Sequence, residues 1–265
     1  MADNAPMSTN RLFAGRAGQT WPWNLDDLPL PSALRALVLA PHPDDFDAVA
    51  VTLRRLHANG NRIDVAVLSG SASGVEDDYR GAVTAADKAA LREEEQRDSC
   101  RLFGLPDDRL VFLRLAEDEA GDLCADAASL TRVRAHVAAV HPDLVFLPHG
   151  NDPNPGHQRA FGFLGEIVRS ARLDVVGLLN RDPKTIAMRD DLYQPFDEET
   201  AAWKGRLLRC HQSQHQRNLN TRGHGFDVRV LAVNRRIATD LGLKAPYAES
   251  FEVWRATDPL RAVRF

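Results

Sequence analysis

Residues 37–45 read Leu37-Val38-Leu39-Ala40-Pro41-His42-Pro43-Asp44-Asp45, an apolar run followed at once by a histidine, a proline and two acids. Such a run is typical of a buried strand, and ligands collect at the carboxyl ends of strands in α/β proteins. His42 and Asp45 are close enough in the chain for one tight turn to direct both at a single cation. The stretch therefore predicts a buried parallel strand and half of a metal site.

The residue types in this stretch suit a divalent metal. Imidazole and carboxylate groups are ligands of zinc, iron and other first-row metals. Asp44 need not bind the ion, and a carboxylate beside a metal is well placed to deprotonate a metal-bound water. We therefore interpret Asp44 as the candidate general base. The alternative interpretation is that Asp44 or Asp45 caps the helix that follows, which is a common use of aspartate.

A third ligand is expected from the loop after the strand signal at 144–148. Residues 149–161 are rich in Pro, Gly and Asn and run into an amphipathic helix. A loop at the carboxyl end of a strand is again a place for function. His157, where the loop meets the helix, is the predicted third ligand, and His149 and Asp152 are its weaker rivals.

Strand and helix signals alternate from residue 36 onward. The expected strands are 36–40, 62–68, 109–113 and 144–147, and the expected helices are 47–59, 84–103 and 127–139. This βαβ rhythm predicts an α/β fold with a Rossmann-like, doubly wound, mostly parallel sheet. No Gly-x-Gly-x-x-Gly pattern follows the first strand, which argues against a dinucleotide. His141-Pro142-Asp143 repeats part of the first motif but precedes its strand, so it would lie at the wrong edge of the sheet.

The C-terminal part predicts a hairpin and helix extension of this sheet. Ranges 175–180 and 185–189 flank the turn signal Arg181-Asp182-Pro183-Lys184 and predict a hairpin. Helices are expected at 198–214 and 228–241, and a last strand at 250–254. We expect an N-terminal arm at 1–31, pinned by Trp21 and Trp23, and a single domain at 32–265.

Composition limits the classes of function. The 265 residues are 44% hydrophobic and carry 33 basic against 37 acidic side chains, a net charge of -4. This balance gives no general attraction to nucleic acid or to an anionic membrane, and the polar stretch 211–225 lacks interleaved aromatics. Three cysteines without a Cys-x-x-Cys pair imply neither a disulfide framework nor a zinc ribbon. The N-terminus lacks a basic segment with an apolar core, so we expect a cytoplasmic protein without nucleic-acid or membrane partners.

Five segments, in order, resemble one known family. His42-Pro43-Asp44-Asp45 is similar to the signature of the PIG-L/LmbE superfamily of zinc-dependent de-N-acetylases. The other similar segments are the loop Ser69–Gly74, the Arg-x-x-Glu helix at Arg92–Glu95 with Phe103-Gly104, the loop ending in His157, and the series Lys204, His211, Ser213 and Gln214. The resemblance covers most of the chain from about residue 36.

The resemblance implies a role for each matched residue. The family's metal ligands fall on His42, Asp45 and His157, and its general base falls on Asp44. Arg92 matches the substrate-binding arginine. His211 is expected to contact the substrate or to be a hydrogen-bond partner close to the metal. The implied cofactor is one Zn2+ ion per chain, with Fe2+ or another divalent metal as an alternative.

Two departures from the family pattern bear on the chemistry. Phe46 stands where the family usually has a glutamate that is not a ligand, so metal binding should survive. Asn154 and Gly156 stand where the family has the first His and the Asp of a His-Pro-Asp-His segment. That histidine stabilises the oxyanion or assists proton transfer in the family. Asparagine can donate a hydrogen bond to an oxyanion but cannot carry a proton at neutral pH.

The sequence therefore predicts a metal-dependent hydrolase that removes an acetyl group from an N-acetylated sugar or a related small polar amide. Asp44 would take the proton of the water and return it to the amine, and Asn154 would help to stabilise the oxyanion. Two alternatives stay open. One is a metal-dependent hydratase or lyase acting on an oxo-acid, and the other is a metal-loaded binding protein with weak catalysis. A homo-oligomer is also an open expectation.

Overall fold

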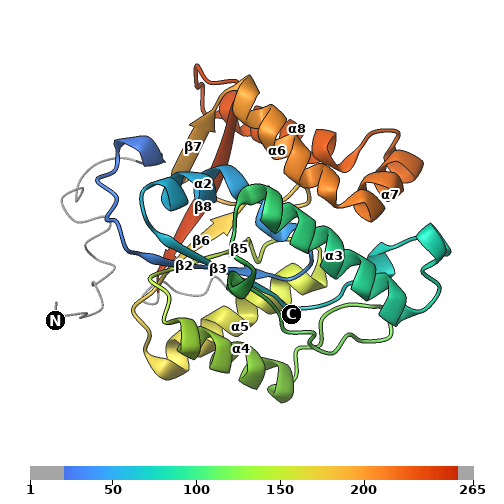
Figure 1. Cartoon of the computed structure of the whole chain (residues 1–265). Helices are drawn as coiled ribbons and strands as arrows, with labels where there is room; N and C mark the ends of the chain where they lie inside the picture. Colours follow the sequence, from blue (N-terminus) through green and yellow to red (C-terminus); the bar gives the residue numbers. More distant parts are fainter. Residues whose placement is uncertain (1–20, 256–265) are drawn as a thin grey trace.

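The computed structural model describes residues 21–255, which form one eight-stranded mixed sheet between two layers of helices (Figure 1). The order across the sheet is β1-β7-β8-β6-β5-β2-β3-β4. The strands are β1 (Trp23–Asn24), β2 (Arg35–Ala40), β3 (Arg62–Val67), β4 (Leu110–Phe112), β5 (Leu144–Pro148), β6 (Val176–Asn180), β7 (Leu192–Phe196) and β8 (Tyr247–Arg255). The predicted α/β class is confirmed.

Five neighbouring strands form the parallel part of the sheet. β4, β3, β2, β5 and β6 run in the same direction, and Val38 of β2 lies opposite Val65 of β3 and Phe146 of β5. All residues of β5 and β6 are buried, as expected for strands covered on both faces. From β2 the chain continues to β3 and β4 on one side, and it then returns through α4 to β5 on the other side of β2. The carboxyl end of β2 therefore lies at the topological switch point, where α/β folds bind their ligands.

The predicted hairpin is wrong. β6 and β7 are not neighbours, because β8 lies between them and pairs antiparallel with both. The second predicted strand, 185–189, is part of a loop, and β7 begins only at Leu192. The backbone N–H of Thr185 does donate a turn hydrogen bond to Asp182, but all five residues of β6 pair with β8, which occupies the place of the predicted second strand. Loop 181–191 is therefore placed at the carboxyl edge of the sheet.

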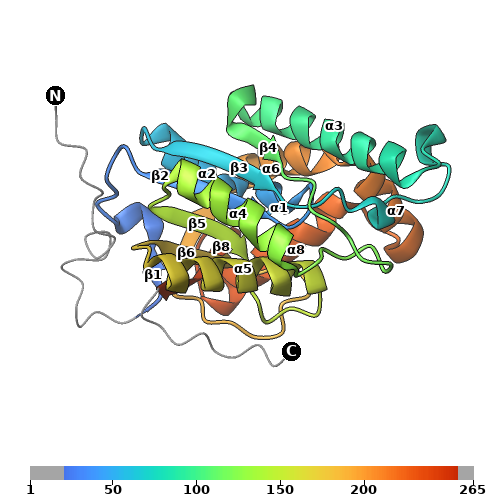
Figure 2. The ribbon, with the colours of Figure 1, turned by 90° about the horizontal axis from the view of Figure 1, so that it is seen from below.

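Helices cover both faces of the sheet. α4 and α5 pack together on one face, whereas α2, α3, α6 and α8 lie on the other (Figure 2). The helices are α1 (Asp45–Ala48), α2 (Ala50–Ala58), α3 (Ala85–Phe103), α4 (Ala127–Val140), α5 (Pro155–Ala171), α6 (Glu198–Cys210), α7 (Gln212–Arg222) and α8 (Phe226–Asp240). Short 3-10 turns are η2 (Leu25–Asp27), η3 (Ala72–Gly74), η4 (Tyr79–Gly81) and η5 (Asp107–Arg109).

The side chains of β2 alternate between two apolar cores. Val38 and Ala40 join the core on the α2 and α3 side, and Leu37 and Leu39 join the core formed with α4 and α5. This period of two is what a strand covered on both faces requires. The central strands are thereby held rigidly, and so is the turn that leaves β2.

Two predicted helices are each divided in two. Val49 separates α1 from α2, and His211, with a ψ of 66°, separates α6 from α7. The first break is bridged by a buried ion pair, because Lys204 Nζ lies 2.7 Å from Glu249 Oε1 and donates to the Ala48 carbonyl at 2.6 Å. The carboxylate of Glu249 accepts the backbone N–H groups of residues 51 and 52 at 3.0 and 2.8 Å, which caps the start of α2.

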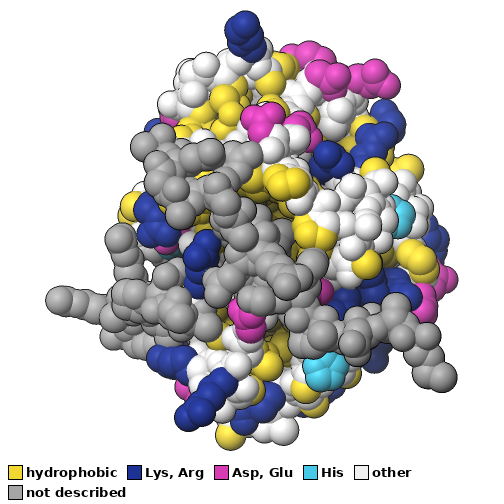
Figure 3. Space-filling view, turned by 90° about the vertical axis from the view of Figure 1, so that its left-hand side faces the viewer, with side chains coloured by type: hydrophobic (Ala, Val, Ile, Leu, Met, Phe, Trp, Pro, Cys, Tyr) yellow, Lys and Arg dark blue, Asp and Glu magenta, His cyan; other side chains and the backbone are white. Residues whose placement is uncertain are grey.

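The N-terminal arm contributes an edge of the sheet. β1 pairs with β7, Trp23 is buried in the core, and Trp21 stacks on it with ring centroids 3.9 Å apart. The part of the predicted arm before residue 21 lies outside the described residues. Across 21–255, no helix is long and apolar enough to cross a membrane. On the face drawn in Figure 3, basic and acidic side chains are interspersed.

Candidate metal centre

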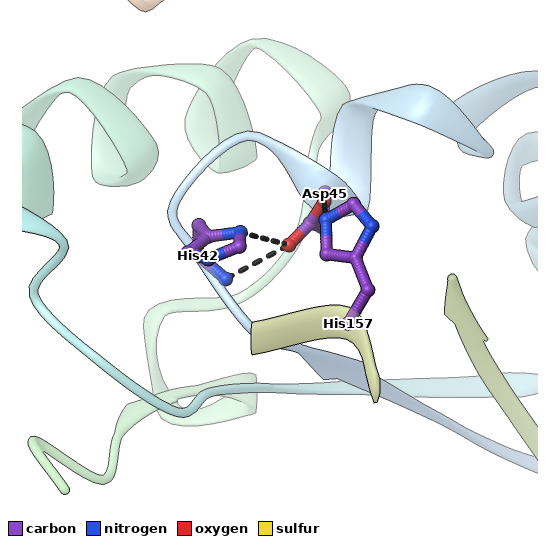
Figure 4. A group of neighbouring side chains, drawn as sticks. All are labelled: His42, Asp45 and His157. Carbon is purple, nitrogen blue, oxygen red and sulfur yellow. Dashed lines mark hydrogen bonds and ion pairs between the residues drawn. The ribbon is translucent and has the colours of Figure 1, made fainter. Parts of the chain in front are cut away.

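Three predicted metal ligands converge at the carboxyl ends of β2 and β5. His42 Nδ1 lies 3.2 Å from Asp45 Oδ2, and His157 Nε2 lies 3.5 Å from Asp45 Oδ1 (Figure 4). One ligand atom of each residue lies within 4.8 Å of the others. Two of these residues follow β2, whereas His157 comes from the first turn of α5, so the fold joins segments that are more than 100 residues apart.

The donor set and its spacing fit a zinc ion. A tetrahedral ion with bonds of about 2.0–2.1 Å separates its ligand atoms by about 3.3–3.4 Å. The 3.2 and 3.5 Å separations, which involve Oδ2 and Oδ1 of the Asp45 carboxylate respectively, are close to that value. Two imidazoles and one carboxylate leave a fourth position for water or substrate, as in catalytic zinc sites, and the same set accepts iron. The structure thus supports a possible metal site at His42, Asp45 and His157.

The ligands are held by their surroundings. Asp45 Oδ2 accepts the backbone N–H of His42 at 2.8 Å, which closes the turn after β2. Burial would raise the pKa of Asp45, but hydrogen bonds and charge from His157 and His42 outweigh it and hold that pKa well below its usual range. Gly156 packs directly against the imidazole of His42, because a Cβ there would lie 2.6 Å from Nε2. The glycine at position 156 therefore makes room for the imidazole of His42, a candidate metal ligand.

Asp152, a rival ligand in the sequence analysis, lies on the outer side of His157. Its Oδ2 is 3.5 Å from His157 Nδ1, and its Oδ1 accepts the backbone N–H of Asn154 at 2.8 Å. Burial lowers the pKa of His157, but hydrogen bonds to Asp152 and Asp45 raise it to about 10. A carboxylate on the far nitrogen of a histidine ligand orients the ring. Asp182 lies near enough to complete a second group with Asp152 and His157.

The other rival, His149, is directed elsewhere. Its Nε2 lies 3.4 Å from Glu252 Oε2 on β8, and it does not join the group of candidate ligands. His149 follows β5 immediately, whereas His157 is carried back toward β2 by the start of α5. The choice of His157 over His149 therefore agrees with the geometry.

Asp44 lies beside the candidate metal ligands in a left-handed backbone conformation, with a φ of 108°. Its N–H donates to Gln96 Oε1 at 2.9 Å, and its Oδ2 accepts from Arg92 Nη2 at 2.8 Å. Burial raises the pKa of Asp44 to about 6, although the charge of Arg92 opposes the rise. The Asp44 side chain makes no capping hydrogen bond, and that of Asp45 accepts from His42. The helix-cap alternative for this acid pair is therefore wrong.

Arg92 is buried, with 2% of its surface exposed, and it hydrogen-bonds to the turn that contains Asp44. Its Nη2 also donates to the Pro43 carbonyl at 2.5 Å, and its Nη1 donates to the Ser71 carbonyl at 3.1 Å. The guanidinium borders the cavity. Direct contact with a substrate, as the resemblance implies, stays a prediction, whereas the contact with Asp44 is observed.

His211 lies behind the site and does not line the cavity. Its ring is fully buried, with Nε2 2.7 Å from Asp47 Oδ2, and its charge acts on Asp44. A substrate contact of His211 is therefore not supported in this conformation, and the expected role as a nearby hydrogen-bond partner agrees better with the structure. Sequence reasoning missed Asp47, which also accepts from Ser99 and Gln96. An acid between Phe46 and Val49, in an otherwise apolar turn, was the available signal.

A cavity of about 300 Å³ opens over the candidate metal ligands. Asn154 lines it, and its Oδ1 accepts the backbone N–H of Gly156 at 2.9 Å, so its amide nitrogen is the end that can donate to a bound molecule. The walls come from loop 181–184, η3, α7 and α8. The polar 211–225 stretch thus borders the pocket.

The family comparison matches the part of the chain that holds these residues. Residues 37–168 match the family model described as PIG-L: GlcNAc-PI de-N-acetylase. This protein carries a PIG-L-type segment. That segment includes the three candidate ligands together with Asp44, Arg92 and Asn154, so the resemblance found in the sequence is confirmed. A search of the curated proteins gives no match.

Solved structures show the same fold over most of the chain. N,N'-diacetylchitobiose deacetylase from Pyrococcus horikoshii has a TM-score of 0.68 at 18% identity, with 86% of this chain and 88% of that chain covered. The zinc-inhibited form of teicoplanin deacetylase has a TM-score of 0.63 at 15% identity, covering 84% and 99%. The 4-carboxy-2-hydroxymuconate hydratase from Pseudomonas putida KT2440 has a TM-score of 0.63 at 19% identity, covering 86% and 99%. Deacetylases and a hydratase thus share this fold.

Proposed function

We propose that this protein is a metal-dependent hydrolase that removes an acetyl group from an N-acetylated sugar or a related small polar amide. The observation that carries the proposal is the convergence of His42, Asp45 and His157 beside a buried carboxylate, Asp44, in one cavity. The PIG-L-type segment contains all four residues. Zinc is the proposed metal, and iron(II) satisfies the same ligands.

Zinc, when bound by these three side chains, would acidify a water and polarise the acetyl carbonyl. Asp44 accepts the proton of the attacking water and returns it to the departing amine as the C–N bond breaks. The raised pKa of Asp44, about 6, suits a group that must both take and return a proton. Arg92 fixes the orientation of this carboxylate through the 2.8 Å contact.

Asn154 takes the place of the family's histidine in this scheme. Its amide nitrogen donates to the carbonyl oxygen as negative charge develops there. The proton transfer to the amine falls to Asp44 alone, because an amide side chain carries no proton at neutral pH. His157 keeps its orientation through Asp152, which lies on its outer nitrogen.

A second candidate function is a hydratase or lyase acting on an oxo-acid. Asn154 in place of the histidine keeps it open, because hydration of a double bond delivers the proton of water to carbon and involves no departing amine. A hydratase among the similar folds shows that the architecture is compatible with that chemistry. A metal-loaded protein with weak catalysis is the remaining alternative, and it predicts ligand binding without turnover.

Metal content and acetate release together test the proposal. The substrates are N-acetylglucosamine and its simple conjugates, assayed with the wild type, Asp44→Asn, His157→Ala and the control His149→Ala. We expect about one metal per chain in all but His157→Ala, and acetate release only where metal and Asp44 are both present. Metal without acetate would favour the hydratase or binding alternative. Absence of metal from the wild type would overturn the site.

The proposal concerns a small-molecule substrate. A cytoplasmic location and the lack of nucleic-acid and membrane partners stay predictions. A homo-oligomer also stays a prediction, which measurement of the molecular mass in solution tests directly.

A further inference from the structure

The cavity that contains the candidate metal ligands is lined by many basic side chains. Besides Arg92, the lining contains the following cations: Arg181, Lys184, Arg217, Arg222 and Arg229. Its acids other than Asp44 and Asp45 are Asp122 and Asp182. The positive charges come from loop 181–184, α7 and α8, and so face the site from two sides.

These cations differ in whether another group of the protein forms an ion pair or hydrogen bond with them. Arg181 is paired with Asp190 at 3.0 Å, and Arg217 donates to the Ser73 carbonyl at 3.4 Å. Across residues 21–255, the side chains of Lys184, Arg222 and Arg229 make no ion pair and no hydrogen bond, although the backbone N–H of Lys184 donates to Asp182 Oδ1 at 2.9 Å. Three cations that border the site are thus without a fixed acceptor in the described part of the chain.

Arg229 is the most informative of these three because it is half-buried on α8. Burial lowers its pKa, and the charges that act on it are those of Asp182, Arg222, Asp44 and Asp152. Its guanidinium is therefore near enough to feel the charges of both the acids of the metal site and Arg222. Withdrawing a guanidinium from water without an acceptor is unfavourable, and an anionic ligand would offset that cost.

The neighbours of Arg229 on α8 complete a subsite. Phe226, Val230 and Val233 line the cavity and give it an apolar wall next to the guanidinium. Such a wall lowers the local dielectric constant and strengthens a charge-assisted hydrogen bond made beside it. The planar fork of an arginine matches a carboxylate or a phosphate with two parallel hydrogen bonds.

We propose that the substrate carries an anionic oxygen group, a carboxylate or a phosphate, which Arg229 and Arg222 bind while the acetamide lies at the metal. Lys184 and Arg217 add positive charge at the opening. This inference rests on the proposed deacetylation for the identity of the reacting group, but the anion subsite itself does not depend on that reaction. The neutral parent sugar is accordingly cleaved with a lower kcat/KM than its anionic derivatives.

The test compares three substrates that differ in the anionic group. N-acetylglucosamine is neutral, its 6-phosphate carries a phosphate, and N-acetylglucosaminuronate carries a carboxylate. We expect kcat/KM to be at least roughly 10-fold higher for one charged substrate than for the neutral one. Which of the two is preferred identifies the anion. The preference should weaken as salt is raised from 50 to 500 mM, because the cations at the opening are exposed.

Variants of the two arginines locate the subsite. Arg229→Gln and Arg222→Gln should each lower the ratio of charged to neutral kcat/KM by roughly 10- to 100-fold. Arg229→Lys keeps the charge but loses the fork, and should lower the ratio by less. The control is Arg236→Gln, also on α8, which pairs with Asp240 outside the cavity and should leave the ratio unchanged. A melting curve of each variant shows that it is folded.

Binding of the deacetylated product separates this inference from the proposed reaction. Glucosamine 6-phosphate and glucosaminuronate are titrated calorimetrically, with inorganic phosphate as a further probe. Binding of either amine that is weakened at least roughly 10-fold in Arg229→Gln supports the subsite even if no amide is cleaved. Acetate release with equal kcat/KM for neutral and charged substrates would overturn the inference and leave the deacetylase proposal standing. No binding of any anion by the folded wild type would also overturn it.

Discussion

Replacing Gly156 by alanine should weaken metal binding while leaving the fold intact. An added Cβ would lie 2.6 Å from His42 Nε2 and 3.0 Å from Cε1, well inside ordinary contact, which begins at 3.4 Å. The imidazole would therefore have to move by about 0.8 Å, whereas metal–ligand distances hold to about 0.2 Å. Disturbing the groups that orient a ligand costs about 10- to 100-fold in metal affinity. We expect the Kd for zinc to rise by at least that factor.

The effect on the fold should be smaller. Gly156 lies in the first turn of α5 and is not among the glycines with positive φ, so alanine fits its backbone. Alanine is favoured over glycine in a helix by about 0.5–1 kcal/mol, and a forced contact in a packed site costs about 1–3 kcal/mol. The metal-free variant should therefore lose at most about 2.5 kcal/mol of its free energy of unfolding.

Competition with a chelating dye measures the zinc Kd, and denaturant unfolding of the metal-free protein measures stability. Gly205→Ala on α6 is the matched control, because its Cβ would meet Arg209 and Leu231 at an ordinary 3.7 Å. An unchanged zinc Kd in a folded Gly156→Ala variant would refute the reasoning. It would mean that His42 is not a ligand, or that the glycine is not what makes room for it.

Three further predictions follow from contacts near the site. Arg92→Gln removes the 2.8 Å contact to Asp44, so kcat should fall roughly 10- to 100-fold while the metal content stays the same. Lys204→Met leaves the Glu249 charge buried without its partner and should destabilise the protein by about 3–5 kcal/mol in urea unfolding; Glu249→Gln added to it removes the charge but keeps an oxygen for the buried N–H groups of α2, and should recover part of the loss. Hydrogen bonds from His149 and the Arg189 backbone outweigh burial and lower the pKa of Glu252 from 4.5 to about 2. The ionised Glu252 therefore stabilises the folded protein above pH 4.5, and this stabilisation is lost between pH 4.5 and 2. Glu252→Gln should make the free energy of unfolding depend less on pH in that range.

The sequence contained enough to predict the centre of the fold and of the site. The apolar run at 37–40 ends where β2 ends, and the residues after it lie at the switch point of the sheet. The sequence favours His157 over His149 because His157 stands where the loop meets a helix, and the structure brings it to 3.5 Å from Asp45. Both predictions depend on local signals, namely the length of an apolar run and the composition of a loop, which can be recognised from neighbouring residues in the sequence.

The predictions that were wrong concern elements whose structure depends on partners that are distant in sequence. The turn signal at 181–184 is real as a local turn, but β8, more than 60 residues later, takes the place beside β6. Val49 interrupts a helical pattern because Glu249 and Lys204 bond the backbone on either side of it. No glycine or proline stands at residues 48–50 to indicate the break in the sequence.

The same limit explains why the anion subsite was missed. Arg209 and Arg229 are both arginines on amphipathic helices of the polar C-terminal region, and composition does not distinguish them. Arg209 reaches Asp227 at 2.5 Å, whereas Arg229, only two residues further along α8 than that aspartate, turns to the cavity and has no ion pair across 21–255. Whether an arginine is paired with a carboxylate depends on the helix face that it occupies and on whether the facing helix has an acidic side chain within reach. The metal ligands define the reaction and can be predicted from local sequence, but the charges that select the substrate depend on how α7 and α8 pack over the site.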